Sequence, residues 1–333
     1  MRPSLGTVLR CLLAGGVAGA AVLLPLVVAI LPLNRRWRLV DYLLSVAASA
    51  IRGFAGSRAS IKRKEEAKGG AGPPPPILVL YEYETCPFCR LVRETLTALD
   101  LDFEMRPCPM PSMSLPVPEG VKQGLSRHRP ELSALGGKMQ VPFLIDGDMK
   151  TYESSRIIEY LLHKYAAEPP PSEAEREGAL RRWAVMRDSL RLLTSGLASH
   201  LRGMLHMGLV RVPSRPAALP LELVSYEAHP GARLVREALC ALELRYVVRT
   251  TPLGSSKRRG PNGRSPPWLV DPNTGFETGD CHAAADYLYD TYATGDPPHG
   301  AESVTWVAFT RRRMEAMRGL VKSLWARVGP LSV

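Results

Sequence analysis

The chain has 333 residues, of which 45% are hydrophobic and 23% charged, a composition that excludes a disordered polymer and leaves room for two modest domains. Its formal net charge of +11 favours anionic surfaces but does not choose among nucleic acid, lipid headgroups and acidic ligands. Nucleic acid is the weakest of the three, because no zinc-binding cysteine set, RNP-like strand or DNA-binding helix signature appears. Six cysteines with one close pair do not form a secreted disulfide framework.

The N-terminal segment from Cys11 to Leu33 is apolar and uncharged over the length that crosses a bilayer, for which about 20 residues suffice. Arginines 35, 36 and 38 follow it closely, which places the rest of the chain on the cytosol-like side by the positive-inside rule. A cleaved targeting peptide is the alternative, but its apolar region is usually shorter and no small-residue cleavage site follows. Residues 1–38 are therefore expected to form a single membrane anchor.

Residues 39–76 are expected to connect this anchor to the first domain. The run "RLVDYLLSVAASAIRGFAG" predicts an amphipathic helix, either on the membrane surface or packed against the protein. The following "SIKRKEEAKGGAGPPPP" mixes charges, glycines and prolines and predicts a linker.

Residues 77–166 alternate strand-like and helix-like runs. "ILVLYEY" predicts a strand, Pro87 to Leu99 a helix, and "DFEMRP" a second strand parallel to the first. After a proline-rich loop come a short helix, a strand entered through Val141-Pro142, an Asp-Gly turn to another strand, and a helix from Ser154. The order βαβαββα is that of a thioredoxin-like α/β domain.

Three motifs in this domain carry a family resemblance: Cys86-Pro87-Phe88-Cys89, Val141-Pro142 and Glu153-Ser154, in that order and at fitting separations. Residues 77–165 thereby resemble the glutathione S-transferase N-terminal and glutaredoxin branch of the thioredoxin superfamily. Each motif alone is weak, since a single C-x-x-C pair also occurs as half of a zinc site. The three together are specific.

The cysteine pair predicts redox chemistry. Cys86 lies where a strand ends and a helix begins, so unpaired backbone N–H groups and the helix dipole stabilise its thiolate and make it the nucleophile. Cys89 lies one helical turn further on, where it can attack a mixed disulfide on Cys86 as the resolving thiol. A structural disulfide or a metal half-site is the competing interpretation, and no metal site is predicted.

The resemblance implies glutathione as cofactor, bound beside Pro87 and Phe88 of the C-x-x-C motif. In similar proteins the proline matching Pro142 is cis, and the backbone of Val141 pairs with the cysteinyl part of glutathione. Glu153 and Ser154 match the residues that hold its γ-glutamyl end at a helix start. A plain helix cap would also select these two residue types.

A second copy of the pattern occupies residues 220–293. "VSYEAHPGARLVREAL" repeats the frame of "LYEYETCPFCRLVRETL" at an offset of 143 residues, with His229 at the position of Cys86 and Ala232 at that of Cys89. Pro267 matches Pro142, and Asp280-Cys281 matches the Glu-Ser pair. We expect a second thioredoxin-like domain without dithiol chemistry, in which His229 is a solvated or satisfied histidine rather than an anion ligand or base.

Two helical segments complete the chain. The connector 167–219 places leucines at helical spacing, among them Leu190, Leu193 and Leu197, and predicts one long or broken amphipathic helix. The tail 294–333 predicts a basic amphipathic helix that packs on a domain or touches anionic lipid. A complete glutathione S-transferase would place an all-helical domain of well over 100 residues after its first domain, so the usual conjugating site is missing.

The whole arrangement resembles plant and algal tandem proteins with two glutathione S-transferase N-terminal-like domains, which implies a plastid. The first domain is also similar to membrane-associated prostaglandin E synthase type 2. The resulting hypothesis is a membrane-anchored, glutathione-linked thiol-disulfide oxidoreductase acting on protein or small-molecule disulfides, with its domains on the cytosolic or plastid stromal side. The alternative is a non-catalytic scaffold that binds glutathione or an iron-sulfur cluster through Cys86, which visible absorption of fresh protein would reveal.

Overall fold

The computed structural model describes residues 33–64, 77–109, 126–168, 178–203, 208, 211–255, 257 and 263–294. Of the predicted anchor, residues 1–38, only 33–38 are among these residues, and of the predicted C-terminal helix, residues 294–333, only residue 294. Among the helices of the described ranges, none combines the length and apolar character needed to cross a membrane. The chain divides into two compact units, residues 1–43 and 44–333, and everything below concerns the second.

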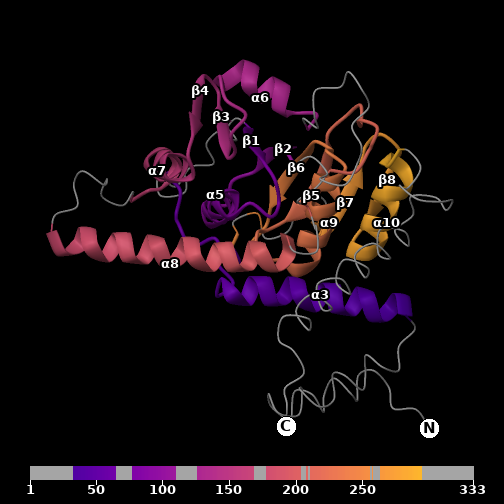
Figure 1. Ribbon diagram of the computed structural model, residues 1–333, viewed down its shortest axis with the longest axis horizontal. Helices are drawn as coiled ribbons and strands as arrows, with labels where there is room; N and C mark the ends of the chain where they lie inside the picture. Colours follow the sequence, from indigo (N-terminus) through magenta and orange to yellow (C-terminus); the bar gives the residue numbers. More distant parts are fainter. Residues whose placement is uncertain are drawn as a thin grey trace, which may run out of the picture. The chain divides into compact units, whose positions relative to one another are not determined.

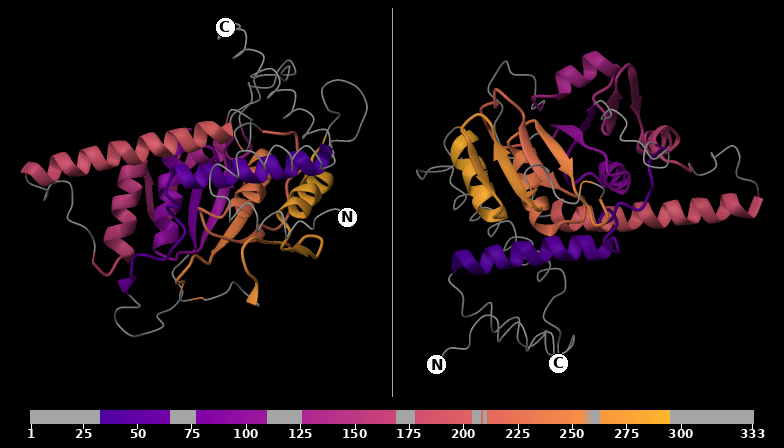
Figure 2. Two further views of the ribbon diagram at one scale, coloured as in Figure 1. Left: turned by 90° about the horizontal axis from the view of Figure 1, so that it is seen from below. Right: turned by 180° about the vertical axis from the view of Figure 1, so that it is seen from behind.

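One eight-stranded sheet forms the centre of this unit, in the order β4-β3-β1-β2-β6-β5-β7-β8 (Figure 1). The strands of the first half are β1 (Leu78–Glu82), β2 (Phe103–Pro107), β3 (Phe143–Asp146) and β4 (Met149–Tyr152). Those of the second half are β5 (Leu221–Ser225), β6 (Tyr246–Thr250), β7 (Trp268–Asp271) and β8 (Phe276–Thr278). In Figure 2 the purple strands of the first half and the orange strands of the second lie side by side.

The first half follows the order expected from the sequence. Its helices are α5 (Pro87–Ala98), α6 (Arg129–Gly136) and α7 (Ser154–Tyr165), set between the strands as βαβαββα. Strand β1 pairs in parallel with β2 and antiparallel with β3. Helix α5 begins at Pro87 because proline suits the first helical position, and its apolar side turns toward the sheet, where Val92 and Leu96 are buried.

The second half repeats this pairing with one element fewer. It contains α9 (Pro230–Ala241) and α10 (Cys281–Tyr292), and β5 pairs in parallel with β6 and antiparallel with β7. The expectation of βαβαββα for this half is wrong, because the described residues between β6 and β7 contain no α-helix matching α6. The connection from β6 to β7 is 18 residues shorter than the one from β2 to β3, and the missing residues fall in the region where α6 lies in the first half.

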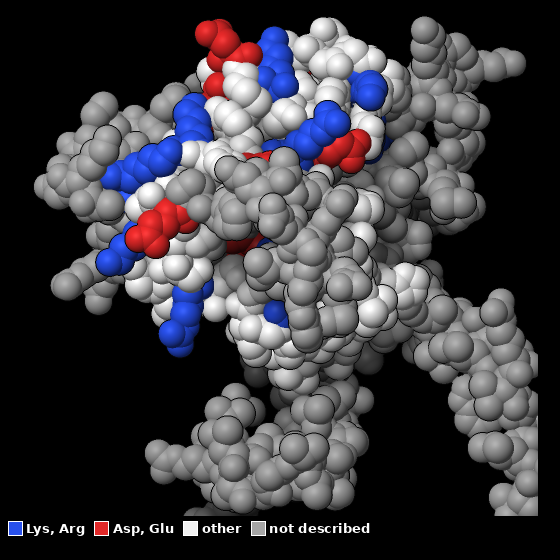
Figure 3. All heavy atoms as spheres, turned by 90° about the vertical axis from the view of Figure 1, so that its left-hand side faces the viewer, with Lys and Arg blue, Asp and Glu red and all other residues white. Residues whose placement is uncertain are grey.

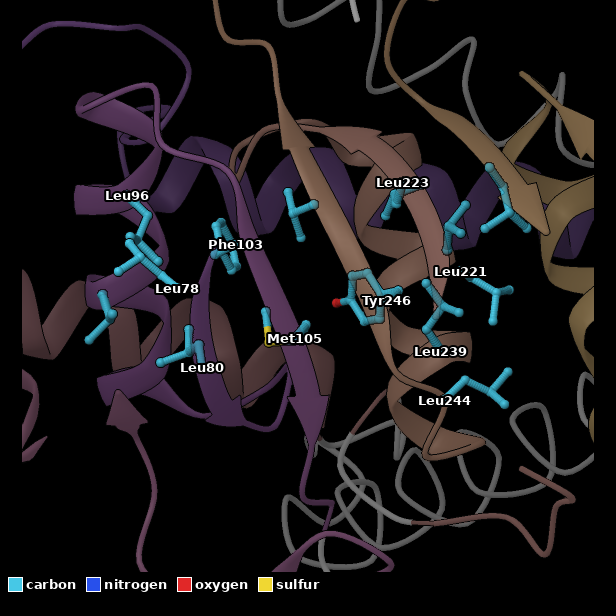
Figure 4. Close-up of a cluster of buried hydrophobic side chains, with 14 of the residues drawn as sticks. Leu78, Leu80, Leu96, Phe103, Met105, Leu221, Leu223, Leu239, Leu244 and Tyr246 are labelled. Carbon is cyan, nitrogen blue, oxygen red and sulfur yellow. The ribbon is translucent and has the colours of Figure 1, made fainter. Parts of the chain in front are cut away.

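The two halves join where β2 pairs antiparallel with β6. Glu104 lies opposite Val247, its counterpart at the 143-residue offset, so this pair marks a local twofold axis between the halves. Next to it Met105 lies opposite Tyr246, and both side chains are buried (Figure 4). One apolar cluster includes residues from both halves, from Leu78 and Phe103 to Leu221 and Leu239. The halves therefore share a core rather than standing as separate domains.

A buried aspartate ties the closing helix of each half to the sheet. Asp146 at the end of β3 accepts hydrogen bonds from the Tyr165 hydroxyl at 2.6 Å and from Lys164 at 2.7 Å. Asp271 at the end of β7 accepts in the same way from Tyr292 at 2.5 Å and Tyr287 at 2.7 Å. A buried carboxylate is stable only when it is bonded in this way, so each aspartate sets where its helix lies.

Helix α8 (Gly178–Gly203) buries a different face from the one expected. Leu190, Leu193 and Leu197 are 60%, 60% and 53% exposed, whereas Ser195 and Arg202 are fully buried. The hydroxyl of Ser195 donates to the Pro87 carbonyl oxygen at 2.7 Å, and Arg202 is paired with Glu237. The buried part of α8 thus carries polar side chains beside Ala198, because their partners are a carbonyl oxygen at the start of α5 and a carboxylate within α9.

Residues 44–64 belong to the packed unit to a greater extent than expected. Ser45 and Ser49, near the end of α3 (Leu33–Ile51), donate to the carbonyl oxygens of Pro230 and Ala228 at 2.9 Å each. The segment after the helix also makes backbone hydrogen bonds, from Ala59 to Leu253 at 2.9 Å and from Ile61 to Ala98 at 3.0 Å. For this end of the helix, packing against the protein is the interpretation that holds. Of the predicted linker, residues 60–64 are part of the packed unit, and residues 65–76 lie outside the described residues.

Candidate functional site

The site begins at the junction of β1 and α5. Cys86 is the N-cap of α5, with φ of −74° and ψ of 121°, and its Sγ accepts a hydrogen bond from the Cys89 backbone N–H at 3.3 Å. An N-cap side chain that accepts from the first turn satisfies a donor that the helix cannot pair itself. Because a thiolate is the better acceptor, the same geometry stabilises the charged form of Cys86.

The surroundings give the two cysteines different acidities. Burial opposes ionisation of Cys86, but hydrogen bonds from Cys89 and Phe88 and the charge of Arg93 outweigh it and lower the pKa of Cys86 to about 7. Burial, followed by the hydrogen bond and charge of Cys86, raises the pKa of Cys89 well above its usual value. At neutral pH about half of Cys86 is thiolate while Cys89 holds its proton, which is the division that a nucleophile and a resolving thiol need.

Buried charges lie behind the cysteines. Arg93 of α5 is ion-paired with Glu82 and donates to the carbonyl oxygen of Glu84 at 3.0 Å, and it is 1% exposed. Burial raises the pKa of Glu82 to about 8 against the opposing charge of Arg93. The surface differs: on the face in Figure 3, lysines and arginines stand as separate groups, several of them next to an aspartate or glutamate.

Val141 and Pro142 reach the same sheet edge as the cysteines. Strand β3 runs antiparallel to β1 with Phe143 opposite Tyr81, so the residues just before Phe143 lie at the edge where β1 ends and leads to Cys86. The Val141-Pro142 peptide bond is cis, as the resemblance implies. Pro142 is buried and Val141 half-buried. Phe88, between the cysteines, is 46% exposed.

Glu153 and Ser154 stand at the start of α7, but Glu153 does not cap the helix. Its side chain makes no capping bond, and its carboxylate instead accepts from the Gln140 amide at 2.9 Å. Its φ of 69° is in the left-handed region, which is unfavourable for a residue other than glycine, asparagine or aspartate. The plain-cap interpretation of this pair therefore does not describe Glu153, whose exposed carboxylate is turned away from the helix axis.

His229 occupies the position of Cys86 in the second half and copies its capping bond. Its Nδ1 accepts from the Ala232 backbone N–H at 3.1 Å. Burial, with the charges of Arg236 and Arg233, lowers the pKa of His229 to about 4, so the ring is neutral at pH 7. Helix α10, which begins at the Asp280-Cys281 pair, is capped as well, since the Asp280 carboxylate accepts from the backbone N–H of His282 at 2.8 Å and of Ala283 at 2.9 Å. This half has neither the thiols nor an uncapped helix start.

Sequence reasoning missed the charged residues that surround the site. Glu84, Arg93, Glu227 and Arg236 are at most 4% exposed, although they stand in a loop and on helices where charges are normally solvated. A signal was present: Glu84 and Arg93 recur as Glu227 and Arg236 at the 143-residue offset, while the cysteines between them do not recur.

Cys86 is expected to react with iodoacetamide first among the buried cysteines. Burial raises the pKa of Cys108 to about 12, and those of Cys89 and Cys240 also lie well above their usual value. At pH 7 Cys86 should be alkylated at least about tenfold faster than these three, because the thiolate is the reacting species. Mass spectrometry of a Cys281→Ser protein, which lacks the more exposed thiol, would measure the rates. Earlier labelling of Cys89 or Cys108 would refute the assignment of the nucleophile.

Comparison with known proteins places the first half in a family. Residues 80–170 match the family model described as glutathione S-transferase, N-terminal domain. No curated protein matches the chain. A solved structure of a trimeric glutathione transferase from Leishmania is similar at 16% identity, covering 68% of this chain and 70% of that one with a TM-score of 0.24, which adds nothing to the assignment. Residues 80–170 are thus a thioredoxin-like domain of the glutathione S-transferase N-terminal type.

Proposed function

We propose that this protein is a glutathione-linked thiol-disulfide oxidoreductase in which Cys86 is the nucleophile and Cys89 the resolving thiol. The observation that carries the proposal is the N-cap geometry of Cys86, whose Sγ accepts from the Cys89 N–H at 3.3 Å and whose pKa is lowered to about 7. A lowered thiol pKa at a helix start is typical of catalytic cysteines and unusual for buried structural ones.

The reaction proceeds by two exchanges. The Cys86 thiolate attacks one sulfur of a substrate disulfide, a new bond forms between Cys86 and that sulfur, and the other half leaves as a thiolate that takes up a proton. Cys89 then loses its proton and attacks the Cys86 sulfur, which closes the Cys86–Cys89 disulfide and releases the second half as a thiol. Two molecules of glutathione reduce this disulfide and leave as glutathione disulfide.

The charges at the site favour this order. The hydrogen bond and the charge of Cys86 both raise the pKa of Cys89 while Cys86 is a thiolate. Both effects disappear once Cys86 is bound in a mixed disulfide, so Cys89 becomes easier to ionise at the step that uses it. Because Cys86 is only 2% exposed, neighbouring side chains must move before a disulfide can reach its sulfur.

Glutathione would bind along the sheet edge that carries the cysteines. The backbone of Val141 would pair with its cysteinyl part, beside Pro87, Phe88 and Pro142. The Glu153 carboxylate, which is exposed and held by Gln140, would accept the γ-glutamyl ammonium. The backbone N–H groups at the start of α7, with Ser154, would bind the γ-glutamyl carboxylate. The positions of these residues support the proposal.

We further propose that the second half is a degenerate thioredoxin-like repeat kept for packing and not for its own chemistry. The strand pairing of β5 with β6 and β7 supports it, as does the bond from Ala232 to His229, which preserves the cap of α9 without a thiol. The arrangement would be that of a plant or algal tandem protein. Only the first half would then be similar to prostaglandin E synthase type 2.

A reductase assay on the purified protein tests the main proposal. A peptide carrying glutathione on a cysteine is the substrate, and release of the free peptide is followed in the presence of glutathione and glutathione reductase. The proposal expects turnover that depends on glutathione. Binding of glutathione without any turnover would contradict it.

The membrane anchor is also a proposal, resting on the apolar segment from Cys11 to Leu33. The protein would sit in a membrane by one span, with its globular part on the cytosolic or plastid stromal side. We expect the full chain to remain in the membrane pellet after alkaline carbonate, whereas a chain starting at Asn34 should appear in the supernatant. The shorter chain keeps Ser45, Ser49 and Arg52, which the packed unit uses. Full-length protein in the carbonate supernatant would reject the anchor.

A further inference from the structure

Two buried ion pairs cross between the halves in a reciprocal manner. Arg93 of the first half donates through Nε to Glu227 of the second at 2.7 Å. Arg236 of the second half donates through Nε and Nη2 to the two carboxylate oxygens of Glu84 of the first, at 3.0 and 2.9 Å. Residues 93 and 84 correspond to residues 236 and 227 at the 143-residue offset. The local twofold axis at the seam, where β2 pairs with β6, therefore relates one ion pair to the other.

Glu84 lies two residues before Cys86, and three of its groups are held by other elements. Its N–H donates to Sγ of Cys240 at 3.4 Å, its carbonyl oxygen accepts from Arg93 at 3.0 Å, and its carboxylate is bound by Arg236 through both oxygens. Cys240 and Arg236 both belong to α9 of the second half. The loop that carries Cys86 is therefore attached at two of its three points to the half that lacks the Cys-x-x-Cys pair.

We propose that Arg236 is a positioning residue for Cys86 that acts through Glu84 in two ways, by fixing the Glu84 carboxylate and by compensating its charge beside the nucleophile. A guanidinium that binds both oxygens of one carboxylate fixes its direction as well as its distance, which a single charged contact does not do. The half without a Cys-x-x-Cys pair would thus be a working part of the redox site of the other half. The importance of this for catalysis rests on the proposed oxidoreductase function, but the positioning itself does not.

Arg236 also governs the charge balance next to the nucleophile. The charged or titratable groups that act on Cys86 or share its loop are Glu82, Tyr83, Glu84, Cys89 and Arg93. Arg93 lies 3.5 Å from the Glu84 carboxylate and Arg233 lies 3.9 Å from it, both farther than Arg236. Loss of Arg236 would leave Glu84 with its two weaker partners and thus a less compensated negative charge two residues from Cys86.

The test is the pH at which Cys86 becomes reactive. Iodoacetamide labelling of Cys86 is followed by mass spectrometry between pH 5 and 10 in the full chain, purified in detergent. Arg236→Gln should raise the midpoint of labelling by roughly one pH unit, because it removes a positive charge, and Glu84→Gln should lower it by a similar amount, because it removes a negative one. The double variant should return toward the unmodified protein.

Opposite signs distinguish this inference from a purely structural role. If Arg236 and Glu84 only held the fold together, both single variants would loosen the cap and move the midpoint in the same direction, or neither would move it. Either result overturns the proposal. Arg202→Gln is the matched control, since Arg202 is in a buried arginine–glutamate pair with Glu237 at 2.7 Å and bridges α8 to α9 instead of holding the Cys86 loop. It should leave the midpoint unchanged.

Two further measurements keep the outcome decisive. If circular dichroism shows that Arg236→Gln does not fold, Arg236→Lys is used, which keeps the charge but cannot bind both oxygens; a smaller upward shift is expected, and no shift contradicts the proposal. The reductase assay is run separately on the same proteins. Shifted midpoints in a protein without reductase activity would reject the proposed function and leave the positioning role standing.

Discussion

Replacing Cys86 by serine is expected to abolish glutathione-linked reductase activity. The exchange reaction needs sulfur attacking sulfur, and a serine hydroxyl at the helix start keeps the capping bond from Cys89 without providing a thiolate. The fold should therefore survive while the chemistry is lost. The measurement is the glutathione-dependent release of free peptide from a glutathionylated peptide, compared at equal concentrations of folded protein.

His229→Ala is the matched control for Cys86→Ser, because His229 stands at the same place in the second half and makes the same cap. The neutral ring lies in the half that lacks the Cys-x-x-Cys pair, so activity should stay within roughly twofold of the unmodified protein, as for a residue outside the reaction. A loss as severe as that of Cys86→Ser would show that the second half carries chemistry of its own. Reduction of the peptide by Cys86→Ser protein would lead to the same conclusion.

Arg93→Met is expected to destabilise the protein by about 3–5 kcal/mol, which is the usual cost of removing one partner from a buried ion pair. Arg93 is buried and binds Glu82, the carbonyl oxygen of Glu84 and Glu227, and methionine leaves all three without this partner. The free energy of unfolding is measured by urea denaturation of the chain starting at Asn34. A decrease in the free energy of unfolding of less than about 1 kcal/mol would mean that the ion pairs between the two halves contribute little to stability.

The control for Arg93 is an arginine in an exposed pair. Arg191 lies 3.9 Å from Asp188 on α8, with both side chains largely in solvent, so Arg191→Gln should cost less than about 0.5 kcal/mol. The contribution of Glu227 to stability should depend on pH. Burial opposes ionisation of Glu227, but the charges of Arg93, Arg236 and Arg90 outweigh burial and lower the pKa of Glu227 well below its usual value. The stability that Glu227 contributes is therefore present at neutral pH and is lost only in strong acid.

The sequence by itself determined the local order of the first half. An apolar run, a Cys-Pro step and amphipathic spacing predict β1, the start of α5 at Pro87 and the placing of Cys86 at the helix start, and the structure has all three. These features follow from contacts between residues that are close in sequence, such as the Cys89 N–H and the Cys86 sulfur. The repeat offset likewise predicted which strands and helices the second half would contain, except for a helix matching α6, which the described residues of its shorter loop do not contain.

Only the tertiary structure decided which faces are buried and which charges meet. The leucines of α8 predict an apolar contact, yet its protein-facing side carries Ser195 and Arg202, because their partners Pro87 and Glu237 come from distant segments. In the same way Glu84 finds Arg236 across 152 residues. The spacing of hydrophobic residues indicates only which side chains are usually buried, whereas a buried ion pair forms only where two particular side chains come into contact. The pairing of β2 with β6 brings the two halves, and with them Glu84 and Arg236, into contact. No pattern among residues close in sequence predicts this pairing.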